Sequence, residues 1–354
     1  MQVGVSLLFQ GHPGLSDAEV YQREVGMAVE AESMGFDLVL AVEHHFFDYA
    51  MCPDNAQLLS YVAARTSRIK LMPAAFILPW NDPLRVVEKS ILLDHLSQGR
   101  ALIGFGRGLA KKEFDPFRIP FSESRARFDQ AAEIILRGLE TGVVQGDTPF
   151  YKQPAIEVRP RAISSFKNRV YMVGMSPQSI DMCGKLGLGS MKFSNAPWTE
   201  AAGDIKRHRD LYHLSQGRPA PPVLIADVMF CDNDLARAEK AAREYIAGYF
   251  VQVMDHYELL SDNFEKAGGA YPSYAQWAEK LRNSSNQKDA IDSYMEANLW
   301  GDPARILAKL EERRSLIGNF DLSVIVNYAG MPYDTSTRSL RLFVDKVLPA
   351  IKAW

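Results

Sequence analysis

The stretch Phe36-Asp37-Leu38-Val39-Leu40-Ala41-Val42-Glu43-His44-His45-Phe46 joins a short apolar run to a polar end. An uninterrupted apolar run of this length is typical of a strand buried on both faces of a parallel sheet. Glu43, His44 and His45 therefore fall where the strand ends and a loop begins. In a barrel of alternating strands and helices, that rim carries the catalytic side chains.

Glu43, His44 and His45 allow three interpretations. They can be hydrogen-bonded polar residues at an ordinary strand end. A metal site is disfavoured, because neighbouring residues of an extended chain point to opposite faces and the sequence has no His-x-His pattern or second histidine-rich cluster. The third interpretation is proton transfer in a pocket, with one histidine as general acid or base and the other in support.

The rest of the chain repeats the same strand-to-helix pattern. Helix starts are marked by the capping box Ser16-Asp17-Ala18-Glu19 and by Asp82-Pro83, Ser176-Pro177 and Asp302-Pro303, with an N-cap before proline. Residues 143–168 are expected to be an extended excursion. The expected strands are 3–9, 36–40, 69–77, 100–108, 170–174, 189–193, 223–230 and 321–326.

Eight such repeats predict an α/β fold, a TIM (β/α)8 barrel with an insertion before the eighth strand, formed by a single domain of residues 1–354. An open doubly wound sheet is the alternative. That fold favours a GxGxxG turn after the first strand, and this chain has none there.

Composition limits the classes of function. The chain has 354 residues, of which 47% are hydrophobic, and a net charge of −3. Without a basic run, nucleic-acid binding is not expected, and no apolar run reaches the roughly 18 residues of a membrane span. The three cysteines, Cys52, Cys183 and Cys231, are expected to be buried thiols in a reducing cytoplasm, and no secretory signal is visible.

Three further rim segments suggest ligand binding. Ser176-Pro177-Gln178-Ser179 opens a helix, whose N-terminal amides can bind a phosphate. Gly104-Phe105-Gly106-Arg107-Gly108 combines close backbone approach with a guanidinium. Ala74-Ala75 would let a flat group lie against the backbone. Each also has an ordinary explanation, respectively a capped helix, a tight turn and a packing constraint.

Residues 248–298 are too long for a simple connection and are rich in aromatic side chains. Long insertions at a barrel rim are commonly lids, so we expect this segment to close over the site; helical packing on the barrel is the alternative. Its aromatic residues are Tyr249, Phe250, Tyr257, Phe264, Tyr271, Tyr274 and Trp277. Residues that could line an apolar pocket are Phe9, Phe76, Trp80, Phe193 and Trp198.

Together these motifs resemble the bacterial-luciferase-like flavin monooxygenases over nearly the whole chain. The order and spacing of the motifs carry the resemblance more than any one of them. They are Glu43-His44-His45-Phe46, Pro73-Ala74-Ala75 to Leu78-Pro79, Leu93 to Arg100, Gly106-Arg107-Gly108-Leu109, Ser176-Pro177-Gln178-Ser179, Gly301-Asp302-Pro303 and Ser339 to Phe343.

The resemblance implies a TIM barrel that binds reduced FMN from a separate flavin reductase and oxygenates a small, apolar organic substrate with O2. The flavin ring would lie over the Ala74-Ala75 peptide, often cis in the family, beside Gly106. Arg107, Met175, Ser176 and Ser179 would border the phosphate. His44 would be the acid or base, supported by His45 and Glu43. A homodimer is also implied.

The sequence departs from the luciferase subunit at three positions. That subunit has a cysteine at Gly106, a carboxylate at Met175 and a tyrosine at Ala110, whereas Glu113 keeps a carboxylate. Gly106 would leave more room and removes a thiol, so aldehyde oxidation with light emission is not expected. Two alternatives stay open on this barrel: a deazaflavin-dependent hydride-transfer oxidoreductase, whose relatives usually lack the paired histidines, and a non-catalytic flavin-binding protein.

Overall fold

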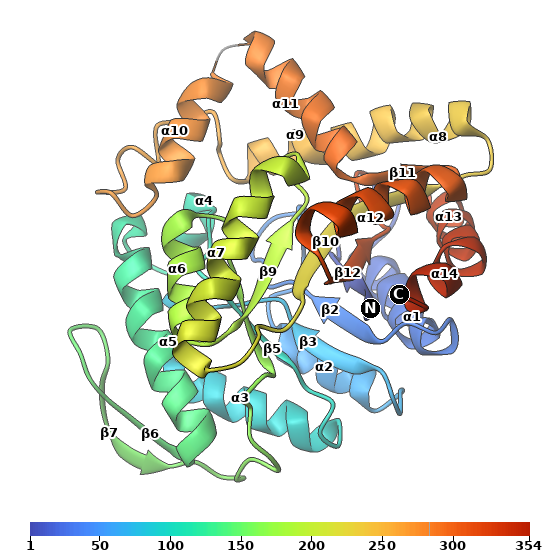
Figure 1. Ribbon diagram of the computed structural model, residues 1–354. Helices are drawn as coiled ribbons and strands as arrows, with labels where there is room; N and C mark the ends of the chain where they lie inside the picture. Colours follow the sequence, from blue (N-terminus) through green and yellow to red (C-terminus); the bar gives the residue numbers. More distant parts are fainter. Residues whose placement is uncertain (283) are drawn as a thin grey trace.

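The computed structural model describes residues 1–282 and 284–354, and it shows a parallel barrel surrounded by helices (Figure 1). The predicted TIM barrel is confirmed. Its strands are β1 (Val3–Leu7), β2 (Leu38–Ala41), β3 (Lys70–Pro73) continued by β4 (Phe76–Ile77), β5 (Ile103–Gly106), β8 (Val170–Val173), β9 (Gly189–Phe193), β10 (Val223–Cys231) and β12 (Phe320–Ile325).

The third barrel strand is divided into β3 and β4, and this division closes the barrel. β3 pairs with β2, as in Leu38 with Lys70, whereas β4 pairs with β5, as in Phe76 with Phe105. A further bridge joins Leu71 to Ala101. The peptide bond between the two halves, Ala74-Ala75, is cis, as the resemblance implied.

The helices begin where the capping patterns predict. Ser16 forms the complete capping box with Glu19, and the side chains of Asp82, Ser176 and Asp302 each accept a backbone N–H of the first helical turn. The helices around the barrel are α1 (Asp17–Ser33), α2 (Asn55–Ala63), α3 (Pro83–Leu96), α5 (Ser124–Thr141), α6 (Pro177–Lys185), α7 (Trp198–Gln216), α12 (Pro303–Ile317), α13 (Tyr333–Lys346) and α14 (Leu348–Lys352).

Two excursions leave the barrel. The first is an antiparallel hairpin of β6 (Val143–Asp147) and β7 (Lys152–Glu157), which projects at the lower left of Figure 1 and confirms the extended segment. The second follows β10 and stands at the top of the same view. It contains α8 (Leu235–Ala241), the π-helical turn η3 (Ala242–Ile246), α9 (Ala247–His256), α10 (Pro272–Leu281) and α11 (Ser284–Ala297).

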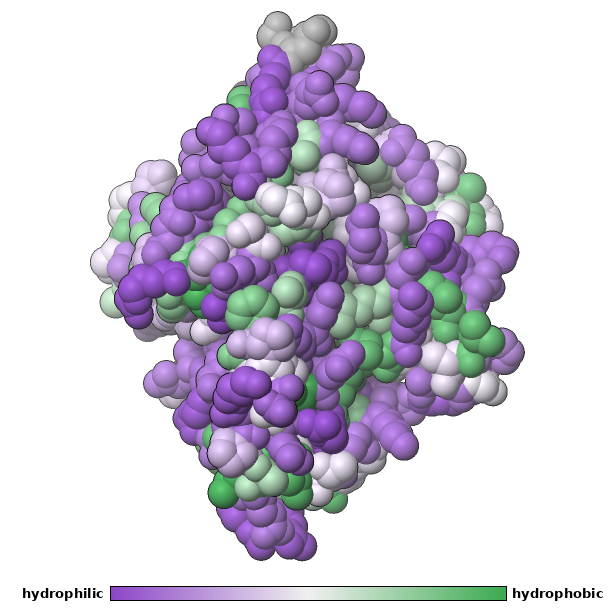
Figure 2. All heavy atoms as spheres, turned by 90° about the vertical axis from the view of Figure 1, so that its left-hand side faces the viewer, coloured by the Kyte–Doolittle hydropathy of each residue, from purple (hydrophilic) through white to green (hydrophobic). Residues whose placement is uncertain are grey.

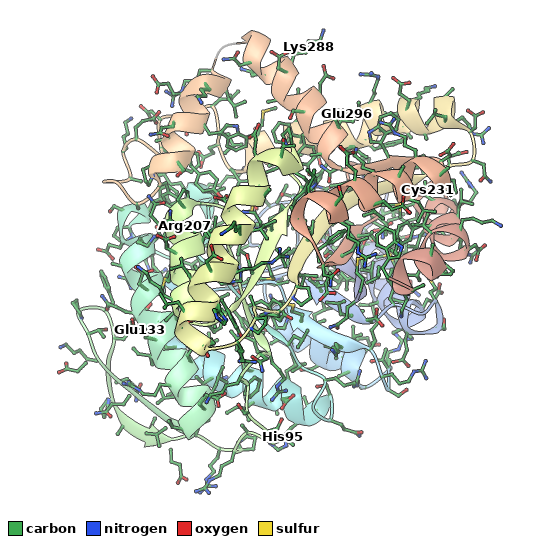
Figure 3. All side chains as sticks on the ribbon, in the orientation of Figure 1. His95, Glu133, Arg207, Cys231, Lys288 and Glu296 are labelled. Atoms are coloured by element: carbon green, nitrogen blue, oxygen red, sulfur yellow. The ribbon has the colours of Figure 1, made fainter. Side chains whose placement is uncertain are left out.

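Contacts at its C-terminal end tie the second excursion to the barrel. The short strand β11 (Leu299–Gly301) follows α11 and pairs with β10. Glu296 of α11, labelled in Figure 3, accepts a hydrogen bond from Arg305 of α12 at 3.0 Å. Residues 248–298, the predicted insertion, therefore form a helical segment that lies before the last barrel strand.

The interior and the surface follow the expected division of side chains. Cys52, Cys183 and Cys231 are buried thiols, as predicted. None of the helices in the described part of the chain is both long enough and apolar enough to cross a bilayer. Figure 2 shows hydrophilic side chains over most of one face, with hydrophobic residues in small groups between them.

Candidate active site

His44 and His45 point in different directions from the end of β2. His44 lines a cavity at the barrel mouth. His45 instead packs edge-on against Trp80 and Phe117, with ring centroids 5.7 and 4.8 Å away. The sequence argument that adjacent histidines face opposite sides is therefore confirmed. The structure leaves His44 as the one of the pair that can meet a ligand in this cavity.

Glu43 is buried and joins the ends of neighbouring strands. It accepts hydrogen bonds from the indole N–H of Trp80 at 2.6 Å, the side-chain amide of Asn81 at 2.8 Å and the backbone N–H of Ile77 at 3.1 Å. Its Oε1 also lies 3.3 Å from Nε2 of His45. Glu43 thus fixes β2 against the segment after β4, and it positions the loop that carries both histidines.

Glu113 holds the ring of His44 in place. It comes from α4 (Lys111–Phe114), and its Oε1 lies 3.0 Å from His44 Nδ1 and accepts the backbone N–H of His45 at 2.9 Å. Burial would raise the pKa of Glu113, but the histidines and the amide outweigh it and hold that pKa well below its usual range. The ionised carboxylate makes Nδ1 the donor, which leaves Nε2 of His44 as the ring nitrogen that can exchange a proton with a ligand.

Two residues at the end of α9 complete this network. The Tyr257 hydroxyl lies 3.3 Å from His44 Nε2, and His256 Nε2 lies 3.6 Å from Glu113 Oε1. His256 also stacks on Tyr49, with centroids 4.0 Å apart. Burial lowers the pKa of His256 to about 4, so its ring is neutral at physiological pH. The sequence pointed to Tyr257 as an aromatic of the insertion but gave no signal for His256.

The side chains that could together bind a metal ion are not the adjacent histidines His44 and His45. Among the described residues, His44, Glu113 and His256 place one ligand atom each within 4.8 Å of one another, and His45 is not a member. A carboxylate between two imidazoles is equally the arrangement of an acid–base network. In this structure His44 Nδ1 and Glu113 Oε1 are hydrogen-bonded to each other, so these two atoms are engaged as an acid–base pair.

The floor of the cavity suits a flat ring. It is formed by small and apolar residues at the ends of β2, β3, β5 and β8, including Val42, Ala74, Ala75, Gly106 and Val173. The room beside Gly106 is limited. A Cβ there would lie 2.8 Å from the Ile77 Cδ1 atom and 3.2 Å from the Ala75 methyl, so neighbouring side chains take up the space.

A group of polar and basic side chains lies where the cavity meets the start of α6. Ser176 caps the helix, and its hydroxyl lies 3.0 Å from that of Ser179. The guanidinium of Arg125, on α5, donates to the Ser179 hydroxyl at 3.2 Å. Burial and the charge of Arg107 lower the pKa of Arg125 to about 10. Two guanidiniums beside a helix N-terminus favour a phosphate.

Arg107 links this group of side chains to the insertion. Its guanidinium donates to the carbonyl of Ala270 and lies over the Tyr271 ring, 3.8 Å from the centroid. The Tyr271 hydroxyl in turn donates to the carbonyl of Gly108 at 2.8 Å. Met175, on the same side of the cavity, accepts the backbone N–H of Phe193 at its sulfur, 3.4 Å away. The residue predicted to bind phosphate therefore also contacts the segment predicted to be a lid.

The aromatic predictions are confirmed in part. Trp80 and Phe193 line the cavity. Phe9, Phe76 and Trp198 do not, because their side chains pack in the main hydrophobic core. An aromatic residue at a strand end can point inward or outward, and the sequence does not decide which. Of the aromatic residues predicted for the insertion, the cavity is lined by Tyr249, Phe250, Tyr257, Tyr274 and Trp277, and Tyr294 joins them.

Comparison with known proteins agrees with this geometry. The sequence model of the family "Luciferase-like monooxygenase" matches residues 1–319, and the chain belongs to that family. The alkanal monooxygenase alpha chain of the Kryptophanaron alfredi symbiont is 25% identical over 358 residues, which cover 99% of each chain. The structure of the monooxygenase RslO1 from Streptomyces bottropensis is 26% identical, with a TM-score of 0.80 over 99% of this chain and 100% of that one.

Two more distant structures share the fold. The oxygenating constituent of 3,6-diketocamphane monooxygenase from Pseudomonas putida, a type II Baeyer-Villiger monooxygenase in complex with FMN, is 17% identical with a TM-score of 0.72, covering 99% and 98% of the two chains. The coenzyme F420-dependent tetrahydromethanopterin reductase of Methanopyrus kandleri is 21% identical with a TM-score of 0.69, covering 99% of each chain. At these identities the likeness concerns the fold alone.

Proposed function

We propose that the protein is the oxygenase of a two-component flavin-dependent monooxygenase, which takes reduced FMN from a separate flavin reductase and oxygenates a small organic substrate with O2. One observation carries the proposal. One cavity is lined by the His44–Glu113 dyad and, separately, by Arg107, Ser176 and Ser179, the last of which accepts a hydrogen bond from Arg125. That separation of a proton-transferring group from a phosphate site suits FMN.

The residues present fit FMN along the length of the cavity. Arg107, Arg125, Ser176 and Ser179 would hold the phosphate, beside Met175. The ring would rest on the Ala74-Ala75 peptide near Gly106, where the floor is small and apolar. The FMN complex of the 3,6-diketocamphane enzyme, which has the same fold, supports this choice. When bound, reduced FMN supplies the electrons for the reaction with O2.

The chain's own residues would move protons and exclude water. His44 lines the cavity and its Nε2 would give or take a proton, while Glu113 keeps Nδ1 protonated. His45 and Glu43 would support it by fixing the loop. Residues 248–298 would act as a lid, because their aromatic side chains already cover the cavity. We also propose a homodimer in the cytoplasm and a reductase that delivers FMN by diffusion.

The hydride-transfer alternative uses a deazaflavin on the same barrel, and the fold of the tetrahydromethanopterin reductase keeps it relevant. The adjacent histidines His44 and His45 favour the monooxygenase, because deazaflavin-dependent relatives usually lack this pair. A flavin-binding protein without turnover is the remaining candidate. The buried, hydrogen-bonded state of Glu43 and Glu113 favours a working acid–base site over it.

The variant His44→Ala tests the proposal. We expect it to bind FMN as tightly as the parent protein, because His44 is not among the residues that would hold the phosphate, and to lose most product formation. Product is measured by incorporation of oxygen-18 from labelled O2, in the presence of a flavin reductase. His95→Ala serves as the matched control and should keep full activity, since that ring is exposed and hydrogen-bonds the carbonyl of Arg161. Full activity of His44→Ala would remove His44 from the proposed role.

A further inference from the structure

We propose that the substrate is a neutral, planar aromatic compound that carries a phenol or ketone oxygen. This inference rests on the proposed monooxygenase function and names the class of molecule that the cavity selects. It differs from the alkanals named for the curated relatives. Three features of the cavity carry it: the aromatic roof, the position of the tyrosine hydroxyls and the placement of charge.

The part of the cavity wall that the insertion forms is called the roof here. Each helix of the insertion that lines the cavity contributes at least one aromatic ring to it. The rings come from α9 and the residue after it, from α10 and from α11, so three separate segments contribute the same kind of side chain. They are Tyr249, Phe250, Tyr257, Tyr274, Trp277 and Tyr294.

Two pairs of rings that line the cavity are near-parallel, whereas Tyr274 and Trp277 cross at 64°. Phe250 and Tyr294 stack at 4.5 Å with an interplanar angle of 16°, and Tyr49 lies at 14° to Tyr249, 6.0 Å away. Aromatic rings attract other aromatic rings in stacked or edge-on positions, beyond the gain from buried area. A flat ring therefore gains contacts here that an alkyl chain of equal size does not.

Hydroxyl groups gather on the His44 side of the cavity. The Tyr257 hydroxyl is 3.3 Å from His44 Nε2, and the hydroxyls of Tyr49 and Tyr249 are 3.0 Å apart. Each of these hydroxyls keeps a further hydrogen-bonding position, which an alkyl chain could not use. A phenol O–H could donate to the Tyr257 oxygen, and a phenol or ketone oxygen could accept from whichever of Tyr49 and Tyr249 does not donate to the other.

The charges that line the cavity exclude an anionic substrate. Among the described lining residues, the carboxylates are Glu43 and Glu113, which both accept hydrogen bonds from the protein. The lining cation is Arg107, which would hold the phosphate and contacts Ala270 and Tyr271. The hydroxyls of Tyr49, Tyr249 and Tyr257 have no lysine or arginine of the described lining as a partner. A sulfonate or carboxylate at this end would lie near the ionised Glu113 and would find no guanidinium or ammonium group of the described lining beside it.

Isothermal titration calorimetry on the protein saturated with oxidised FMN tests the inference with three probes of equal carbon number: 2-naphthol, decanal and 2-naphthalenesulfonate. We expect 2-naphthol to bind about tenfold more tightly than either of the others. Equal or tighter binding of decanal would overturn the aromatic assignment. Equal binding of the sulfonate would overturn the assignment of a neutral substrate.

The variant Tyr257→Phe separates ring contact from hydrogen bonding. It should weaken 2-naphthol several-fold and leave naphthalene unchanged, whereas Tyr61→Phe, on an exposed ring of α2, should change neither. An equal loss for both probes would contradict the role of the hydroxyl. Saturation with FMN is verified first from the flavin absorbance. Failure to saturate would count against the proposed function, and saturation without a preference would count only against the substrate class.

Discussion

The Oε1 atom of Glu113 lies 3.0 Å from His44 Nδ1 and, at the same time, 2.9 Å from the backbone nitrogen of His45. One carboxylate oxygen therefore fixes both the ring of His44 and the strand-end loop from which it projects. A histidine whose Nδ1–H is held by a carboxylate presents its other nitrogen in a defined tautomer and direction. The function of the cavity depends on that relationship.

The variant Glu113→Gln should lower the rate of product formation by about 10²–10⁴-fold, because a side-chain amide can present its N–H to Nδ1 and so favour the wrong tautomer. FMN affinity should change little, since Glu113 is not among the residues that would hold the phosphate. Steady-state turnover and FMN titration measure the two effects. Glu265→Gln, at a half-exposed pair with Arg282, is the control. Normal turnover of Glu113→Gln would separate the carboxylate from catalysis.

Arg107→Ala and Arg125→Ala should each weaken FMN more than riboflavin, by about tenfold or more, because only FMN carries the phosphate that the guanidiniums would bind. Fluorescence titration with both flavins gives the ratio of affinities. Arg127→Ala is the matched control, since that guanidinium pairs with Glu123 and lies over the ring of Phe150. Equal losses for both flavins would show that the arginines support the pocket without contacting phosphate.

The fully buried Glu24 should make the protein less stable as the pH rises. Burial raises the pKa of Glu24 from 4.5 to about 7, although Asn327 and Tyr333 donate hydrogen bonds to it. The unfolded chain therefore loses this proton first, and the stabilising contribution disappears between pH 4.5 and 7. Glu24→Gln should be more stable than the parent protein by about 3 kcal/mol at pH 8, with little difference at pH 4.

Urea unfolding at several pH values measures this difference. Glu30→Gln, on an exposed position of the same helix, should show no pH-dependent gain. A difference between Glu24→Gln and the parent that is the same at pH 4 and pH 8 would mean that Glu24 keeps an ordinary pKa in the folded state.

Binding of FMN should slow chymotrypsin cleavage between Asp262 and Tyr274. A phosphate between Arg107 and Arg125 would relieve their mutual repulsion and fix Arg107, which also holds the carbonyl of Ala270. Riboflavin should protect less. Cleavage in the β6–β7 hairpin provides an internal reference that flavin should not alter. If FMN left cleavage of the insertion unchanged, the lid would have to be given up.

The fold was largely predictable because its signals are local. Strand 170–174 is an apolar run, and Asp82-Pro83 and Asp302-Pro303 mark helix starts by the chemistry of capping. β11 was missed because three residues directly after a helix carry no periodicity. The division of the third strand was visible only as an unusual Pro73-Ala74-Ala75 segment.

The site was predictable where its residues end strands and not where they lie on helices. His44, Ala75 and Arg107 follow apolar runs, and the barrel brings such positions together. Arg125 and His256 sit on α5 and α9, where an arginine or histidine gives no local sign of its partner. Their roles come from contacts with Ser179 and Glu113, which only the folded chain creates.

The most direct test of the central claim is the rate at which photoreduced FMN returns to the oxidised state when its complex with the protein is mixed with oxygenated buffer. Stopped-flow absorbance in the oxidised-flavin band follows the return, and a peroxide assay follows the fate of O2. We expect the return to be much slower than for free FMN, with hydrogen peroxide released only as the oxidised band recovers. Return at the rate of free FMN would contradict a monooxygenase.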